Sequence, residues 1–239
     1  MNRGIYPVVA GAITRERQLE LLAHNLGNIH TTGFKKDEAI FGTILAQVKG
    51  PPLAGIDLFP QVATVLPDLS QGALRHTGHY LDVALEGDGF FVVDTPQGLR
   101  HFRGGQLRIN DKKELATPLG DPLLGKNGPI KISSGKLTID ETGTVRVNNR
   151  IVGQLRIERL SPSAVPTKAG ELYWIPPKQV EQATDVKVHQ GTLEQANVNP
   201  SLDLVAMIQV TRGYEQMQKA IQTMDDLTGR IIQSAHVQG

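Results

Sequence analysis

The sequence contains no cysteine, which excludes disulfides, thiolate metal sites and cysteine nucleophiles. It has no run of 18 apolar residues, so we expect no membrane-spanning helix. Its formal net charge is only +1, which leaves no broad basic excess for binding nucleic acid. Residues 14–17 (TRER) follow a short apolar patch where a signal peptide would carry its small-residue cleavage site. We therefore expect any export to proceed without a cleaved leader.

Apolar residues recur at intervals of seven near both ends of the chain, a pattern typical of helices that pair along an apolar seam. Near the N-terminus, the predicted seam consists of Ile5, Ala12, Leu19, Leu22 and Leu26. In residues 199–235, it consists of Val210, Met217, Met224, Leu227 and Ile231. Gly33 provides a stop signal after the first predicted helix. Asn199 and Pro200 provide an N-cap and a first helical residue for the second.

Between the predicted helices, short runs of alternating apolar and polar residues are separated by glycine, proline and asparagine. Residues 81–85 and 90–93 flank Gly87-Asp88-Gly89, which predicts a hairpin. Further short strands are predicted at residues 107–109, 130–132, 137–139, 145–147 and 151–157, with turns at 140–143 and 148–149. This spacing favours an all-β domain, either a sandwich or a barrel-like fold.

The predicted fold class is therefore α+β. N- and C-terminal heptad helices pair as a coiled coil, with an inserted all-β domain and an extended connector. The connector is assigned to residues 44–76, which carry four prolines and few periodic signals. The predicted boundaries are 1–43 for the N-terminal helix and the segment after it, 44–76 for the connector, 77–190 for the β-domain and 191–239 for the C-terminal helix.

Both apolar seams need burial, because one large aliphatic side chain contributes about 1.5–3 kcal/mol when buried. An isolated helix is also only marginally stable in water. One solution is an intramolecular helical hairpin that closes a single domain. The other is a helix pair that buries its remaining surface against further copies, and a contact of this kind that does not close generates a filament. The pattern alone does not choose between them.

Several segments resemble chemical motifs but lack essential parts. Residues 120–127 are similar to a phosphate-binding loop, yet Asn127 replaces the required hydroxyl and Gly128-Pro129 follows where a helix must begin. His76 and His79 have only Asp82 at metal-ligand spacing. Tyr173 and Trp174 are able to stack a sugar, although core packing is the commoner fate of such a pair. We therefore expect no enzyme activity, cofactor, metal site or small-molecule substrate.

Three segments, in order, resemble the signatures of the axial rod and hook proteins of the bacterial flagellum. Residues 24–35 are similar to NNLANxxTxGFK, with His24 and Gly27 departing from it; the matching positions include Asn25, Asn28, Thr32, Gly33 and Phe34. Residues 81–91 are similar to LDxAIxGDGFF, including Gly87, Asp88, Gly89 and Phe90. Residues 191–199 are similar to GxLExSNVN, and Tyr214 follows in the next helix; the matching positions include Leu193, Glu194, Asn197, Val198 and Asn199, with Ala196 in place of serine.

This resemblance implies a structural subunit of the basal-body rod, which assembles through its terminal helices into the axial drive shaft. The implied partners are copies of itself, other rod proteins and the flagellar export apparatus. The implied location is the periplasmic rod, with the helices as an inner layer and the β-domain outside. The opening residues 3–6 (RGIY) and the modest length are more similar to proximal than to distal rod proteins. The alternative hypothesis is an extracytoplasmic β-domain that binds glycan or cell-wall material, with the helices as a clamp.

The first signature also has a physical interpretation. Asn25 and Asn28 carry side-chain amides that are able to cap the helix or hold the backbone where it unwinds. Gly33 permits a positive φ angle at the helix exit. Phe34 is then expected to anchor the following segment in an apolar pocket.

Overall fold

The computed structural model describes residues 5–46, 57–161, 166–170, 172–176, 180–183 and 185–237. Within these ranges, the side chains of residues 42–46, 57–63, 231, 232 and 234–237 are outside the described set. The chain divides into two compact units. We name residues 1–27, 37–68 and 199–239 the helical unit, and residues 28–36 and 69–198 the β-domain. Residues 28–36, 69–76 and 191–198 thus lie in the same unit as the predicted β-domain, residues 77–190.

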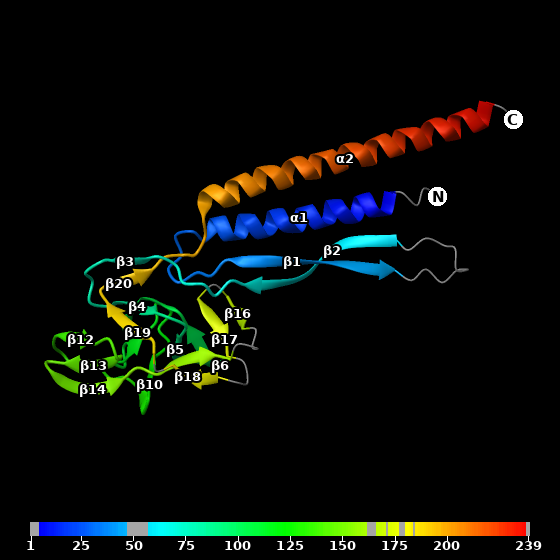
Figure 1. Ribbon diagram of the computed structural model, residues 1–239. Coiled ribbons are helices and arrows are strands. Elements are labelled where there is room, and N and C mark those ends of the chain that lie inside the picture. The colour runs from blue at the N-terminus through cyan, green and yellow to red at the C-terminus, as the bar shows by residue number, and fades with distance from the viewer. Residues whose placement is uncertain are drawn as a thin grey trace. The chain divides into compact units, whose positions relative to one another are not determined.

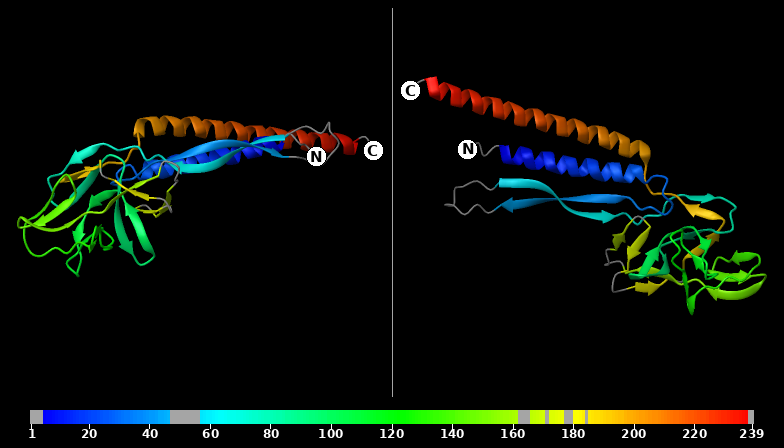
Figure 2. Two further views of the ribbon diagram at one scale, coloured as in Figure 1. Left: turned by 60° about the horizontal axis from the view of Figure 1, so that its bottom comes forward. Right: turned by 180° about the vertical axis from the view of Figure 1, so that it is seen from behind.

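The helical unit contains two helices and one two-stranded antiparallel sheet. The helices are α1 (Ile5–Gly27) and α2 (Pro200–Val237), and the strands are β1 (Asp37–Ala46) and β2 (Asp57–Pro67). The helices lie side by side and antiparallel, and α1 lies between α2 and the β1–β2 pair (Figures 1 and 2). At 1.5 Å per residue, α1 is about 35 Å long and α2 about 57 Å. A large part of α2 therefore extends beyond α1.

The start of α2 has the local structure that its sequence predicts. Asn199 Oδ1 accepts a hydrogen bond from Leu202 N at 3.3 Å, and Pro200 is the first helical residue. This arrangement satisfies one of the amide groups that a helix leaves unpaired at its N-terminus. The predicted N-cap is therefore confirmed.

The β-domain consists of short antiparallel strands. Its largest sheet has the order β16-β17-β6-β5-β15-β18. These strands are β16 (Thr167–Ala169), β17 (Tyr173–Ile175), β6 (Gly98–Phe102), β5 (Phe90–Thr95), β15 (Ile157–Leu160) and β18 (Val180–Gln182). Two three-stranded sheets have the orders β19-β4-β7 and β12-β13-β14. Their strands are β19 (Lys187–Gln190), β4 (Asp82–Glu86), β7 (Gly104–Gln106), β12 (Leu137–Ile139), β13 (Thr144–Val147) and β14 (Arg150–Gln154).

Three strand pairs complete the described part of the β-domain. They are β3 (Leu74–His76) with β20 (Thr192–Glu194), β8 (Arg108–Ile109) with β9 (Leu115–Ala116), and β10 (Leu124–Gly125) with β11 (Gly128–Pro129). The sheets enclose one main apolar core, whose most deeply buried side chains include Val83, Leu85, Phe91, Leu115, Leu123 and Val145. Phe90, Leu160 and Trp174 form a second, smaller cluster. The predicted α+β class, with a helix at each end and a strand-rich centre, is confirmed.

The predicted hairpin around Gly87-Asp88-Gly89 is wrong. β4 pairs with β19 and β7, whereas β5 pairs with β6 and β15. The turn therefore passes the chain from one sheet to another. A Cβ on Gly89 would lie 3.0 Å from Ile157 Cγ2, so this position lies tightly against β15. The alternating pattern identifies a strand, but it does not identify the partner of that strand.

Two further local predictions differ from the structure. Much of the stretch 44–76, predicted as an extended connector, lies in the β1–β2 pair and in β3. Pro60 and Pro67 are compatible with β2, because β1 and β2 form a two-stranded sheet in which each has an open edge. The middle of the predicted connector, residues 47–56, lies outside the described residues. Residues 130–132 were predicted as a strand, and they form only an isolated antiparallel bridge, between Lys131 and Glu114, with Ile130 and Ile132 buried on either side. The turn at Asn148 and Asn149 is confirmed, with φ angles of 49° and 67°.

Candidate functional site

Two glycines, Gly11 and Gly213, lie at the contact between α1 and α2. A Cβ on Gly11 would lie 2.9 Å from Met217 Cε, and a Cβ on Gly213 would lie 3.5 Å from Arg15 Nε. Gly11 of α1 therefore lies against Met217 of α2, and Arg15 lies against Gly213. These two pairs define the antiparallel register of the helices.

The predicted seam residues do not share one environment. Ala12 and Val210 are buried, and the partly buried members are Ile5, Leu19, Leu22, Leu26, Met217 and Met224. Leu227 is 53% exposed, and the side chain of Ile231 is outside the described residues. Leu227 lies ten residues after Met217, which contacts Gly11 of α1. In an antiparallel pair, the facing position lies ten residues before Gly11, ahead of the described start of α1 at Ile5. No described residue of α1 therefore faces Leu227, which explains its exposure. The helices thus pair along only part of α2.

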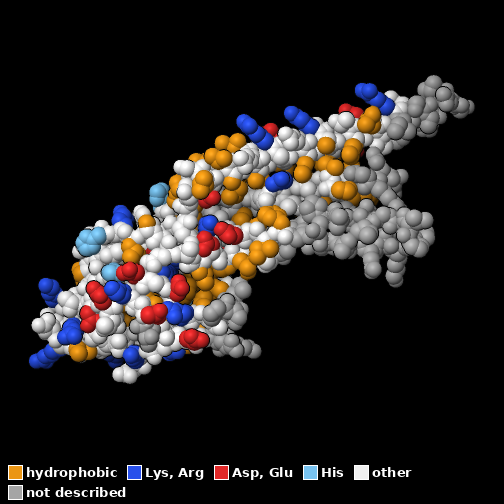
Figure 3. All heavy atoms as spheres, viewed as in Figure 1, with side chains coloured by type: hydrophobic (Ala, Val, Ile, Leu, Met, Phe, Trp, Pro, Cys, Tyr) orange, Lys and Arg blue, Asp and Glu red, His pale blue; other side chains and the backbone are white. Residues whose placement is uncertain are grey.

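The first part of α2 carries an exposed apolar surface, which we name the α2 row. It consists of Leu202, Leu204, Val205 and Ile208, which are 66%, 48%, 53% and 52% exposed. Between Pro200 and Thr211, Asp203 is the single ionisable residue. Figure 3 shows hydrophobic side chains along α2, with lysines and arginines mostly farther along the helix. A solvent-exposed helix face without charges is typical of a surface that contacts another protein.

At the end of α1, Asn25 holds the backbone of the returning chain. Its Nδ2 donates a hydrogen bond to Asp37 O, and its Oδ1 accepts one from Asp37 N, both at 2.9 Å. The Asn25 side chain is buried, and these two bonds fix the start of β1 beside the last turns of α1. The expectation that this amide holds the backbone is therefore met by its geometry.

The segment after α1 turns through Asn28 to Gly33. Asn28 Oδ1 accepts a hydrogen bond from Thr31 Oγ1 at 3.0 Å, and its carbonyl oxygen accepts one from Thr31 N. Thr32 lies in the same turn and is partly buried. Gly33 has a φ angle of 71°, as its position at the helix exit predicts. Phe34 is then 3% exposed, with Lys168 Nζ 4.5 Å from the centre of its ring.

Glu194 is the centre of a buried ionic cluster that we name the clasp, formed with Lys35, Arg103 and Gly72. Glu194 Oε1 accepts hydrogen bonds from Lys35 Nζ at 2.6 Å and from Gly72 N at 2.9 Å. Its Oε2 accepts a hydrogen bond from Arg103 Nε at 2.6 Å. The side chains of Lys35, Glu194 and Arg103 are 1%, 1% and 4% exposed. Buried charges persist only when they are paired and hydrogen-bonded, and the clasp meets this condition.

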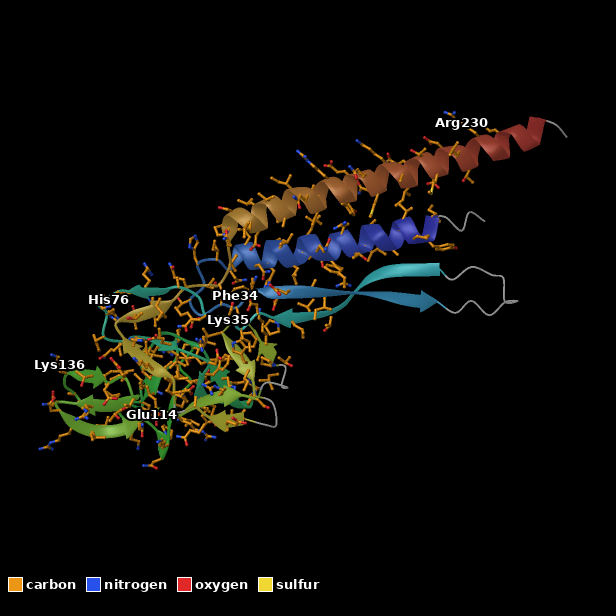
Figure 4. The ribbon with its side chains drawn as sticks, viewed as in Figure 1. Phe34, Lys35, His76, Glu114, Lys136 and Arg230 are labelled. Atoms are coloured by element: carbon orange, nitrogen blue, oxygen red, sulfur yellow. The ribbon has the colours of Figure 1, made fainter. Side chains whose placement is uncertain are left out.

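The clasp connects the segment that follows α1 to the segment that precedes α2. Figure 4 marks Phe34 and Lys35 on the first of these segments. Gly33 N donates a hydrogen bond to Glu194 O at 2.9 Å, and Lys36 N donates one to Asn197 Oδ1 at 2.7 Å. Leu193 and Val198 are buried on either side of these contacts. Two predicted signatures, about 160 residues apart in sequence, thus lie in direct contact.

The central signature reaches the same cluster through Arg103. Arg103 Nη1 donates a hydrogen bond to Gly89 O at 2.5 Å, and its guanidinium carbon lies 5.8 Å from the centre of the Phe90 ring. Gly87 has a φ angle of 103°, and Asp88 is exposed. Arg103 and Gly72 belong to none of the predicted motifs, and no local pattern in the sequence distinguishes them. The three predicted signatures therefore meet around one arginine that sequence reasoning missed.

Tyr214, the last predicted signature residue, is partly buried on α2. It lies beside Gly213, which faces Arg15 of α1. Tyr214 is therefore placed in the helical unit and takes no part in the clasp.

A second buried polar group supports the large sheet. His101, which is fully buried, makes a hydrogen bond of 2.8 Å through Nε2 to Glu158 Oε2. Arg156 Nε donates to the other carboxylate oxygen, Glu158 Oε1, at 2.7 Å. The hydrogen bond with His101, assisted by Arg156, lowers the pKa of Glu158 below its ordinary value of 4.5, although burial opposes this shift. Burial raises the pKa of Tyr173, whose hydroxyl lies between Thr117 and Asp121.

The segments that resembled chemical motifs have structural explanations. Lys126 and Asn127 form the turn between β10 and β11. His76 and His79 are exposed, and no group of three potential metal ligands occurs in the described part of the chain. Tyr173 and Trp174 are 8% and 4% exposed, so they serve as packing residues. In the same described part, no helix is both long enough and apolar enough to cross a membrane.

Comparison with known proteins identifies relatives along nearly the whole chain. The family model for the flagellar hook protein FlgE/F/G D1 domain matches residues 84–147. The model for the C-terminal region of the flagellar basal body rod FlgEFG proteins matches residues 189–234. The flagellar basal-body rod protein FlgG of Borreliella burgdorferi is 30% identical, covering 96% of this chain and 97% of that protein.

Two further relatives carry the name flagellar basal-body rod protein FlgF. The protein of Mesorhizobium japonicum is 29% identical over 90% of each chain. The protein of Salmonella typhimurium is 28% identical, covering 96% of this chain and 97% of its own length. The similarity therefore includes both terminal helices as well as the β-domain.

Proposed function

The chain belongs to the flagellar basal-body rod protein family, and on this premise we propose that it assembles through its terminal helices into the axial rod. Its partners in this proposal are copies of itself and other rod proteins. The α2 row carries the proposal, because it exposes four large apolar side chains on a helix that α1 covers only in part. The role is structural and requires no catalytic step.

The physical argument for assembly starts from the cost of leaving the α2 row in water. Full burial of a large aliphatic side chain contributes about 1.5–3 kcal/mol, so burying the exposed half of four such residues contributes about 3–6 kcal/mol. Each subunit would supply this row again, and contacts that repeat without closing build a filament. We also propose that α1 and α2 pair as a coiled coil, as the heptad patterns predict.

The proposal extends to location and type. We propose that the subunit lies in the periplasmic rod and reaches it through the flagellar export apparatus without a cleaved signal peptide. The proximal, FlgF-type position is favoured by the opening residues 3–6 and by the FlgF relatives of similar length. The glycan-binding alternative is less favoured, because Tyr173 and Trp174 are buried and present no stacking surface.

The test replaces part of the α2 row with polar residues of similar length. Val205→Gln together with Ile208→Gln should abolish incorporation into basal bodies and motility in soft agar, while the circular dichroism of the purified chain remains helical. Thr223→Gln, at an exposed position of the same helix, is the matched control and should leave both unchanged. Normal incorporation of the double variant would rule out the α2 row as an assembly surface.

A further inference from the structure

A pocket in the β-domain lies beside the clasp, because Arg103 belongs to the clasp and also lines the pocket. Its volume is about 360 Å³. Leu69, Phe90 and Leu160 provide apolar walls, Arg103 contributes its guanidinium, and Arg159 and Asp88 complete the polar lining. Pockets of this composition, apolar with a few placed polar groups, are typical of ligand sites.

Arg103 has one guanidinium nitrogen left for a ligand. Its Nε is bonded to Glu194 and its Nη1 to Gly89 O, whereas no hydrogen bond joins Nη2 to another described residue. The residue is 97% buried, since only 3% of its surface is exposed, and it lines the pocket. A guanidinium donor at the wall of a pocket is free to bind an anion, and its natural complement is a carboxylate.

The chemistry of the walls restricts the ligand further. The apolar side chains favour a carboxylate carried on methylene groups, as in glutamate. The exposed carboxylate of Asp88 disfavours a doubly charged group such as phosphate. Arg159 adds positive charge to the lining, although its Nη2 is already bonded to Asp185 Oδ1.

We propose that this pocket binds the side-chain carboxylate of a glutamate from a neighbouring rod subunit. Arg103 Nη2 donates to the carboxylate, and Leu69, Phe90 and Leu160 contact its methylene groups. The site rests on the proposed function, because it assigns a second, polar contact to the assembled subunit. It places this contact in the β-domain, whereas the α2 row belongs to the helical unit.

The first test uses the full chain and sodium butyrate as the probe. Nitrogen-15 NMR of the arginine side chains should show a saturable shift of the Arg103 signals, with a dissociation constant of about 1–10 mM. Butyramide, which has the same shape without the charge, should bind at least tenfold more weakly. An equal response to butyramide, or to sodium chloride at the same ionic strength, would overturn the site. This titration needs no variant and is therefore independent of folding defects.

Variants then link the pocket to assembly. Arg103→Met should abolish butyrate binding, with Trp174 fluorescence as the check that the β-domain still folds. Arg159→Met should weaken binding about threefold, as expected for a charge in a partly exposed position, whereas Arg108→Met outside the pocket should have no effect.

Incorporation into basal bodies distinguishes the two sources of the carboxylate, which are a glutamate of a neighbouring subunit and a small carboxylate in solution. Arg159→Met and Arg103→Met should reduce incorporation into basal bodies more strongly than Arg108→Met. If butyrate binds but both pocket variants assemble normally, the ligand is a small carboxylate and the neighbouring subunit is ruled out. That result leaves the proposed function standing, because its own test depends on the α2 row.

Discussion

Replacing Glu194 by glutamine tests whether the clasp holds the β-domain together. The substitution keeps the size of the side chain but removes the single carboxylate that pairs with both Lys35 and Arg103. Glutamine also introduces an amide donor, which must face either the donors at Lys35 and Gly72 or the donor at Arg103. Removing one partner of a buried ion pair costs about 3–5 kcal/mol, because the remaining charges stay buried.

This magnitude is large relative to the total stability of a domain, about 5–15 kcal/mol. Urea unfolding is the assay, followed by the fluorescence of Trp174, the only tryptophan in the chain. Trp174 is 4% exposed and lies in the β-domain, so it reports on this unit. We expect Glu194→Gln to lower the free energy of unfolding by about 3–5 kcal/mol with an unchanged m value.

Glu181→Gln is the matched control, since Glu181 is exposed on β18 and its loss should change stability by less than about 0.5 kcal/mol. A double-mutant cycle with Lys35→Met should give a coupling energy of about 1–3 kcal/mol, because the two residues are in direct contact. A loss below about 1 kcal/mol for Glu194→Gln, at unchanged m value, would refute the conclusion that the clasp holds the β-domain together.

Three further predictions address single contacts. Gly72→Ala should destabilise the β-domain by more than about 3 kcal/mol in the same urea assay, since its Cβ would lie 1.9 Å from Gln195 O. Gly229→Ala, in open space on α2, should instead stabilise its helix by about 1 kcal/mol. Asn25→Ala removes two hydrogen bonds to the Asp37 backbone and should lower stability by about 1–3 kcal/mol. The loss should appear as faster hydrogen exchange at the Asp37 amide. Asn127→Ala, at an exposed turn, should leave that exchange rate unchanged. The lowered pKa of Glu158 stabilises the folded state at pH values above the unfolded pKa of 4.5. Urea midpoints should therefore fall as the pH drops from 4.5 through the folded pKa. A Glu158→Gln variant whose midpoints show the same pH dependence would contradict this assignment to Glu158.

Local signals in the sequence predicted the features that depend on neighbouring residues. The N-cap at Asn199, the positive φ of Gly33 and the turn at Asn148 and Asn149 were all predicted correctly. Each of these features depends on a single residue type within a few positions of the chain. The terminal helices follow from apolar periodicity in the same way.

Pairing between distant segments was not predictable from these signals. β3 pairs with β20 and β4 pairs with β19, although each pair is more than a hundred residues apart in sequence. The predicted hairpin between β4 and β5 was wrong for the same reason, because period-two alternation is satisfied by any partner strand. Residues 44–76 were assigned to a connector because their proline content concealed the strands.

In the candidate site, too, the sequence identified individual residues but did not show which of them lie together. The sequence identified Glu194, Asn197 and the residues around Phe34 as members of signatures, but it gave no reason to connect them. Arg103 carries no motif, and its role exists only because Gly89, Phe90 and Glu194 surround it after folding.

The sequence by itself determined which segments form helices and which residues begin, end or turn them, because these properties depend on interactions between near neighbours in the chain. Only the tertiary structure decided the strand partners, the clasp and the exposure of the α2 row. A buried charge or an uncovered apolar side chain is defined by atoms that come from distant parts of the chain, and no local pattern specifies them.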